Sequence, residues 1–241
     1  MDAPETQLLL PNVIARCREQ SRSQKLSDST GSSLNGGAVL SRAMALRRVL
    51  RRYYLDESET NVGIIMPPTV AGAVANLALA LDRRVPVNLN FVLSPEALES
   101  SIQEAGIDHI ITSEKVLDRL GLELETPTII LEEIPPLVGP LDMATAAFQG
   151  MVMPQSQLIR HLGLNKTQPD DLFTLLFTSG STGVPKGVML SHRNIASNCA
   201  AIQDHLSIRP DDVLIGVLPF FHAFGLTVTL WMPLVSHASA A

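Results

Sequence analysis

The sequence predicts an α/β fold with a mostly parallel sheet and helices on both faces. Two observations support this prediction. From residue 61 onward, short apolar runs rich in Val and Ile alternate with helical segments, and such alternation implies right-handed crossovers between parallel strands. The chain has 241 residues and is 46% hydrophobic, which suits one α/β domain, or one domain with a small appendage, around a sizeable core.

The first sixty residues contain two helical patterns. Residues 6–19 predict an amphipathic helix. Residues 21–37 are rich in Ser and Gly and are expected to form loops, with a short edge strand near residues 25–29. A second helix follows, and its surface carries Arg42, Arg47, Arg48, Arg51 and Arg52. These arginines could meet an acidic partner or lipid headgroups, but a solvated helix face is the favoured interpretation.

The alternating region has clear start and stop signals. Strands are expected at residues 62–66, 85–89, 109–113 and 128–131. Thr69 can cap a buried helix that runs through Ala80. Ser94 can cap the next helix, which Gly106 ends, and a short third helix is expected to end at Leu120.

The second half of the chain continues this pattern. Residues 141–164 predict a helical pair broken at Pro154, packed on the sheet or projecting as a flap. A buried strand is expected at residues 171–176. Ser191 can cap a later helix, and residues 213–218 predict a further strand.

The stretch after strand 171–176 is the most informative part of the chain. It reads Phe177-Thr178-Ser179-Gly180-Ser181-Thr182-Gly183-Val184-Pro185-Lys186-Gly187. Glycines allow positive φ and close backbone approach, and successive backbone N–H groups in such a turn can form an anion-binding nest. Hydroxyl groups and one lysine add donors that suit phosphate oxygens. The stretch is therefore expected to hold a polyphosphate.

Two other interpretations of this stretch are weaker. Many Ser/Gly runs are hairpins or flexible linkers, but apolar strands on both sides, the rigid Pro185 and the single lysine favour phosphate binding. A Walker loop ends in Gly-Lys-[Ser/Thr]. Here Pro185 precedes Lys186 and Gly187 follows it, which disfavours a P-loop kinase or GTPase.

Composition and charge exclude several classes of protein. The formal net charge is −6 and no long basic run occurs, so nucleic acid is not an expected partner. Cys17 and Cys199 are isolated, which predicts a reduced, cytoplasmic setting. Residues 213–235 are apolar over a length that could span a bilayer, but Pro219 and Pro233 interrupt them and favour a buried strand–helix pair.

Two motifs resemble those of the adenylate-forming superfamily, which includes acyl-CoA synthetases, acyl-ACP synthetases, peptide-synthetase adenylation domains and luciferases. The signature segment, residues 178–187, resembles the family's phosphate loop, and Leu218-Pro219-Phe220-Phe221-His222-Ala223-Phe224-Gly225 resembles its next motif. Residues 62–68, 85–90 and 226–234 look most like the synthetase part of the acyl-ACP synthetase/2-acylglycerophosphoethanolamine acyltransferase group.

The resemblance implies that ATP, with Mg²⁺, activates a carboxylic acid, in this subgroup a fatty acid, to an acyl-adenylate. The acyl group then passes to the thiol of CoA or acyl carrier protein. Residues implied to wrap the phosphates are Thr178, Ser179, Gly180, Ser181, Thr182 and Gly183. Lys186 is implied to hold or close the loop, and Ser181 or Thr182 to reach the Mg²⁺ ion.

The second motif implies further roles. His222 corresponds to a family residue that orients the carboxylate or gates entry, although alone it would be interpreted as a turn histidine. The phenylalanines at 220, 221 and 224 are candidates for an acyl pocket or for plain core. Ser191 and His192 are adjacent and therefore poorly placed for a hydrolase triad.

The resemblance also implies that residues 1–241 are an incomplete large domain. The later motifs for adenine, ribose and a Mg²⁺-binding glutamate are not recognised, nor is the small C-terminal domain with its adenylation lysine. Residues 236–241 depart from the family pattern, which would place a glycine turn and another strand there. The alternative is a truncated, inactive nucleotide-binding remnant. Membrane association is compatible with the subgroup, whose members can be fused to acyltransferase or transporter modules.

Overall fold

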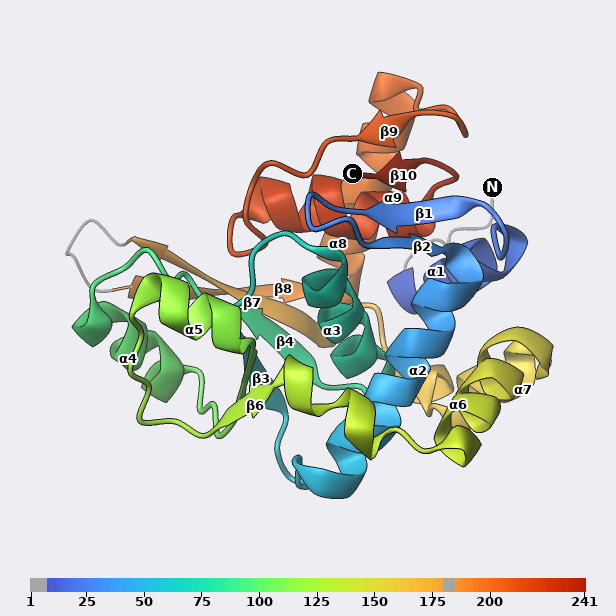
Figure 1. Cartoon of the computed structure of the whole chain (residues 1–241). Helices are drawn as coiled ribbons and strands as arrows, with labels where there is room; N and C mark the ends of the chain where they lie inside the picture. Colours follow the sequence, from blue (N-terminus) through green and yellow to red (C-terminus); the bar gives the residue numbers. More distant parts are fainter. Residues whose placement is uncertain (1–7, 180–184) are drawn as a thin grey trace.

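A six-stranded sheet organises the computed structural model, which describes residues 8–179 and 185–241 (Figure 1). The strand order is β6-β5-β3-β4-β7-β8; the first five strands are parallel and β8 is antiparallel to β7. The strands are β3 (Asn61–Ile64), β4 (Val85–Asn88), β5 (Ile110–Thr112), β6 (Thr128–Ile130), β7 (Leu172–Ser179) and β8 (Pro185–Ser191). The predicted mostly parallel sheet is confirmed.

Helices cover both faces of this sheet. Successive strand residues point to opposite faces, and Ile110 and Ile111 accordingly belong to two separate buried clusters. Helix α3 (Val70–Leu81) packs in one cluster and α4 (Pro95–Glu104) in the other, while α5 (Glu114–Leu120) follows β5. The predicted caps are confirmed, because the Thr69 hydroxyl accepts from the Gly72 N–H and the Ser94 hydroxyl from the Ala97 N–H.

A second sheet joins the two ends of the chain. Its order is β2-β1-β10-β9, formed by β1 (Gln24–Ser27), β2 (Ser33–Asn35), β9 (Val213–Leu214) and β10 (Ser239–Ala240). A strand forms near residues 25–29 as expected, namely β1, but β1 lies between β2 and β10 and is not an edge strand. The Ser/Gly-rich composition did not indicate its hairpin with β2. The strand expected at 213–218 is shorter than predicted, and a strand forms at 239–240.

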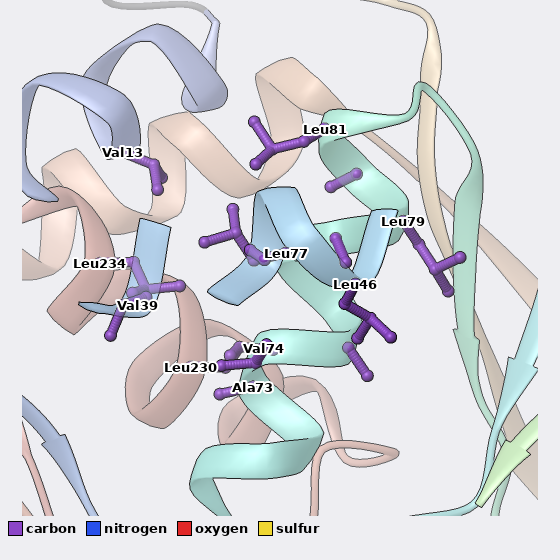
Figure 2. Packing of buried hydrophobic residues seen from close by; sticks show 14 of the residues in the cluster. Val13, Val39, Leu46, Ala73, Val74, Leu77, Leu79, Leu81, Leu230 and Leu234 are labelled. Carbon is purple, nitrogen blue, oxygen red and sulfur yellow. The ribbon is translucent and has the colours of Figure 1, made fainter. Parts of the chain in front are cut away.

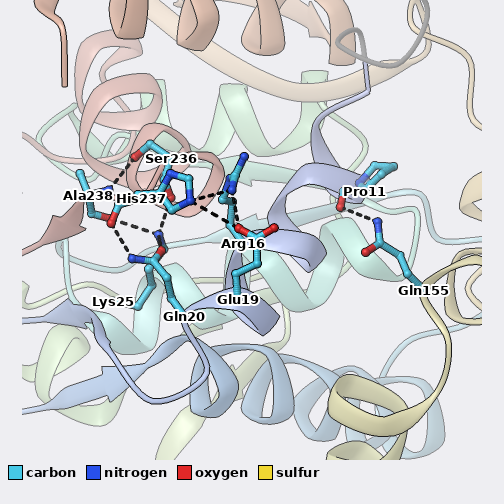
Figure 3. Close-up of polar contacts among 9 residues, drawn as sticks. All are labelled: Pro11, Arg16, Glu19, Gln20, Lys25, Gln155, Ser236, His237 and Ala238. Carbon is cyan, nitrogen blue, oxygen red and sulfur yellow. Dashed lines mark hydrogen bonds and ion pairs between the residues drawn. The ribbon is translucent and has the colours of Figure 1, made fainter. Parts of the chain in front are cut away.

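The buried Lys25 holds the last residues against this sheet (Figure 3). Its ammonium donates to the carbonyl oxygens of Ser236 at 2.7 Å and Ala238 at 3.1 Å, and also to the Gln20 side chain. Burial lowers the Lys25 pKa to about 8. Because three acceptors surround the ammonium, the segment at 236–238 is fixed beside β1.

Helix α2 (Gly36–Tyr53) packs against α3 and against the helices α1 (Leu9–Glu19) and α6 (Pro140–Ala147). Val39 and Leu46 of α2 meet Leu77 of α3 and Leu230 in one apolar cluster (Figure 2). The other helices are α7 (Gln155–His161), α8 (His192–Leu206) and α9 (Met232–Val235), with π-helical turns at Phe148–Val152 and Gly225–Trp231 and 3₁₀ turns at Leu131–Glu133, Pro135–Leu137 and Leu164–Lys166. Helix α6 packs on α2, so the pair expected at 141–164 neither lies on the sheet nor projects as a flap. In the described part of the chain, no helix is long and apolar enough to cross a membrane.

Four arginines of α2, here called the arginine cluster, form ion pairs within the chain: Arg47, Arg48, Arg51 and Arg52. Asp82, at the end of α3, lies 2.8 Å from Arg47 Nε and 3.1 Å from Arg51 Nη1. Asp142, on α6, lies 3.1 Å from both Arg48 and Arg52. Both side chains are buried, with 3% of Asp82 and 6% of Asp142 exposed. Arg51 and Arg52 are exposed, as expected, whereas Arg47 and Arg48 are half-buried. The expectation of a solvated face is therefore correct only in part, and the acidic partners belong to the same chain.

Candidate functional site

Strands β7 and β8 extend into the signature segment from both sides. Thr178 pairs with Lys186, and Ser179 pairs with Pro185 in the last pair of the ladder. The sequence suggested that residues 177–187 connect two strands, but β7 ends at Ser179 and β8 begins at Pro185. Residues 180–184 therefore connect them. Those residues, which include Gly180, Ser181, Thr182 and Gly183, lie outside the described part of the chain. Their roles in holding phosphates and Mg²⁺ stay predictions.

Thr178 and Lys186 face each other across the hairpin. Directly paired residues of antiparallel strands place their side chains on the same face, and both of these are exposed. Neither forms a side-chain hydrogen bond or ion pair with any residue at 8–179 or 185–241. A hydroxyl donor and a compact cation thus lie side by side at the base of the connection, an arrangement that suits phosphate oxygens.

Gly187 has a different role from the one expected for the glycines. It lies in β8 opposite Phe177 and does not adopt positive φ. A Cβ at Gly187 would lie 3.4 Å from the Phe177 ring, in ordinary van der Waals contact, so this buried ring packs beside the Gly187 backbone. In the ladder this pair is next to the pair of Thr178 and Lys186.

The second motif forms a tight turn, the His222 turn (residues 219–225). The His222 N–H donates to the Pro219 carbonyl at 3.0 Å, and the His222 carbonyl accepts from the Leu226 N–H at 2.8 Å. A Cβ at Gly225 would lie 2.3 Å from the Pro219 oxygen, so only glycine fits where the turn closes. The His222 side chain is exposed, with its ring 4.7 Å from that of Phe221.

Phe91 attaches the His222 turn to the main sheet. Its ring meets Phe221 edge-on at 5.0 Å, and it follows β4, the parallel neighbour of β7. Since parallel strands end at one edge, the His222 turn and the end of β7 share the carboxyl edge of the sheet. Sequence reasoning did not single out Phe91, although its position just after a strand was a usable signal.

Of the three phenylalanines of the second motif, two are buried and one is exposed. Phe220 is buried beside Gly72 on α3, and Phe221 is buried against Phe91. Phe224 is 62% exposed. Only Phe224 therefore presents a free apolar face next to His222, and the prediction of an acyl pocket at these three residues stays untested.

Ser191 and His192 have structural positions. The Ser191 hydroxyl caps α8 in a reciprocal pair with Asn194, as predicted. His192 is buried with its ring 4.6 Å from that of Phe173, and burial lowers its pKa to about 4. The cap and the buried ring agree with the rejection of a hydrolase pair.

The described residues do not assemble a metal site by themselves: at 8–179 and 185–241 no group of three or more His, Cys, Asp or Glu could hold an ion. Mg²⁺ takes oxygen ligands and is often held by few protein groups plus substrate phosphates. The hydroxyl-rich signature segment fits that mode of binding, with most ligands supplied by a nucleotide.

Comparison with known proteins identifies the family. A model of the AMP-binding enzyme family matches residues 14–240. The chain belongs to this adenylate-forming family. A 4-coumarate–CoA ligase of Oryza sativa subsp. japonica is 27% identical over 202 residues, which are 82% of this chain and 36% of the ligase. A long-chain-fatty-acid–CoA ligase of Escherichia coli O157:H7 is 26% identical over 191 residues, or 69% of this chain and 34% of that protein.

A solved family structure agrees with the fold. ATP-bound MatB from Rhodopseudomonas palustris superposes with a TM-score of 0.68 at 24% identity, covering 95% of this chain and 44% of that chain. This chain therefore spans about a third of the two curated relatives and less than half of MatB. The resemblance to adenylate-forming enzymes is confirmed. The narrower likeness to acyl-ACP synthetases is not, since the relatives are named CoA ligases.

Proposed function

We propose that this chain is the N-terminal part of a ligase that uses ATP to activate a carboxylic acid and then transfers the acyl group to a thiol. The observation that carries the proposal is the exposed Thr178–Lys186 pair on the same sheet edge as the His222 turn. CoA is the favoured acceptor because the relatives above are named CoA ligases; acyl carrier protein is the alternative. A fatty acid is the favoured substrate, from the subgroup likeness and the long-chain-fatty-acid–CoA ligase.

In this reaction a carboxylate oxygen attacks the α-phosphorus of ATP and pyrophosphate leaves. Negative charge on the β- and γ-phosphates must be held and neutralised while that bond breaks. Lys186 supplies a positive charge, and the hydroxyl of Thr178 a donor, on one face of the hairpin. Bound Mg²⁺, held with Ser181 or Thr182, would further neutralise the phosphates. His222, exposed at the same edge, would orient the carboxylate or gate its entry.

A second candidate is a non-catalytic nucleotide-binding protein. The short coverage of the relatives, 36% and 34% of their lengths, favours it for these 241 residues alone. In that case the hairpin still binds the polyphosphate of ATP, but no acyl-adenylate forms. Membrane association is proposed only for the ligase, because it rests on the likeness to the acyl-ACP synthetase subgroup.

ATP–pyrophosphate exchange, measured with dodecanoate and with 4-coumarate, distinguishes the two candidates. Acid-dependent exchange supports the ligase, whereas ATP binding without exchange supports the non-catalytic protein. Lys186→Ala should lower exchange roughly tenfold or more, since a charge-assisted hydrogen bond contributes about 1.5–3 kcal/mol. Lys166→Ala is the matched control, because Lys166 is an exposed lysine on the turn Leu164–Lys166. Equal exchange by Lys186→Ala and wild type would contradict the assigned role.

A further inference from the structure

A cavity of about 590 Å³ opens beyond the carboxyl ends of the parallel strands. Met66 and Pro67, after β3, form part of its wall, as do Phe91 after β4, Val116 after β5 and Leu131 after β6. Small-molecule sites typically measure about 300–1,000 Å³ and are mostly apolar with a few polar groups. This cavity, here called the switch-point cavity, has that size and character.

Sheet topology places the cavity where ligands bind in related architectures. The chain passes from β3 through α3 to β4 on one side, then returns through α4 to β5 on the other side of β3. The strand order therefore reverses between β3 and β5. In open α/β sheets the crevice outside the carboxyl ends of the strands at such a reversal is the usual ligand site. The residues that follow β3 and β5 line the switch-point cavity at this position.

Two cations at the rim suit an anionic group. Lys115 and Arg119 lie one turn apart on α5 and line the cavity, and neither forms an ion pair with any residue that the structure describes. Among the described lining residues, two are acidic, and each accepts hydrogen bonds from backbone N–H groups rather than pairing with Lys115 or Arg119. Asp28 accepts from the N–H groups of Val70 at 2.8 Å and Thr30 at 2.9 Å, and Glu132 accepts from the Glu114 N–H at 3.3 Å.

We infer that the switch-point cavity is a second small-molecule site, for an amphipathic organic anion. The apolar body would lie against Met66, Phe91 and Leu131, and a carboxylate, sulfonate or phosphate group would meet Lys115 and Arg119. Of the described residues that line the cavity, none belongs to the β7–β8 hairpin. The cavity shares one wall with the His222 turn, since Phe91 also contacts Phe221.

A fluorescence titration with 1-anilinonaphthalene-8-sulfonate tests this inference, because the probe combines an apolar ring system with one negative charge. Wild type should bind it saturably with one-to-one stoichiometry, and decanoate should displace it. The double variant Lys115→Ala/Arg119→Ala should bind it several-fold more weakly. The matched control Lys166→Ala/Arg209→Ala removes two exposed cations elsewhere and should bind the probe like wild type.

A second variant fills the space without removing charge. Ala71 is exposed on the first turn of α3 and lines the cavity, so Ala71→Trp should abolish one-to-one binding while Lys115 and Arg119 remain. Circular dichroism and the unfolding midpoint establish that each variant is folded. Wild-type binding by the double variant, or by folded Ala71→Trp, would overturn the inference. The titration contains no ATP, so its outcome is independent of the adenylation proposal.

Discussion

The two edges of the six-stranded sheet differ in whether their charged side chains are paired within the chain. At the amino edge the charged side chains are paired. Asp82, before β4, pairs with Arg84 and with the arginine cluster. Glu59, before β3, pairs with His109, before β5, and its carbonyl accepts from Arg84. At the carboxyl edge, Lys186 is exposed and has no side-chain partner in the described chain. Charges satisfied internally stabilise the fold, whereas unpaired donors at a carboxyl edge are available to ligands.

The largest expected effect of a substitution is at the amino edge, at Asp82. Its buried carboxylate lies within 3.1 Å of Arg47, Arg51 and Arg84. Removal of one partner from a buried ion pair destabilises by about 3–5 kcal/mol, so Asp82→Ala should lower the free energy of unfolding by that amount in a urea titration. Asp118→Ala, an exposed acid on α5, is the control. A loss below about 1 kcal/mol for Asp82→Ala, within the range of a single neutral hydrogen bond, would remove the distinction between the two edges.

His192 should make the stability of the amino edge depend on pH. Its imidazole is buried at the end of β8, with a pKa lowered from 6.5 to about 4. The unfolded chain therefore binds the proton more readily, and the stabilisation present above pH 6.5 is lost as the pH falls toward 4. The full loss is about 3 kcal/mol, from 1.36 kcal/mol per unit. Denaturation of wild type and His192→Phe between pH 4 and 7 measures it; parallel curves would show that His192 does not titrate as a buried group.

A smaller effect is expected at Ser191, where β8 meets α8. Its hydroxyl accepts from the Asn194 N–H, and the Asn194 side chain accepts from the Ser191 N–H at 2.9 Å. Loss of an N-cap hydroxyl typically reduces stability by about 1 kcal/mol. Ser191→Ala should show this loss in urea, and Ser191→Asp, which keeps an acceptor, should restore most of it. No difference between Ala and Asp would mean that the cap is unimportant.

The smallest effects on stability should be at the carboxyl edge. Lys186→Ala and His222→Ala remove exposed side chains that form no hydrogen bond or ion pair in the described chain, and such substitutions usually change stability by less than about 0.5 kcal/mol. Their unfolding midpoints should therefore coincide with that of wild type. A clear shift for either would show that the residue supports the fold rather than a ligand.

Local signals in the sequence predicted much of this architecture. Thr69, Ser94 and Ser191 were identified as caps because each precedes a helical apolar pattern, and the structure confirms all three. The two motifs predicted the family because their residue types and spacing are specific. The parallel sheet followed from alternation, which depends only on neighbouring segments.

Features that depend on distant residues were not predictable. The ion pairs of the arginine cluster were not predicted because its acids, Asp82 and Asp142, lie far along the chain. The hairpin of β1 and β2 was missed because its strands are short and polar. Its partner β10, which pairs with β1, lies at the other end of the sequence. The contact of Phe91 with Phe221 could not be predicted, because it joins two residues that are far apart in the sequence.

The most direct test of the account is calorimetric titration of the purified chain with ATP and Mg²⁺. Wild type should bind ATP saturably, pyrophosphate should compete, and Lys186→Ala should weaken binding about tenfold or more through loss of a charge-assisted contact. Lys166→Ala should bind ATP as wild type does. Undiminished binding by folded Lys186→Ala, no competition by pyrophosphate, or no binding by wild type would contradict the claim that the β7–β8 hairpin holds the polyphosphate.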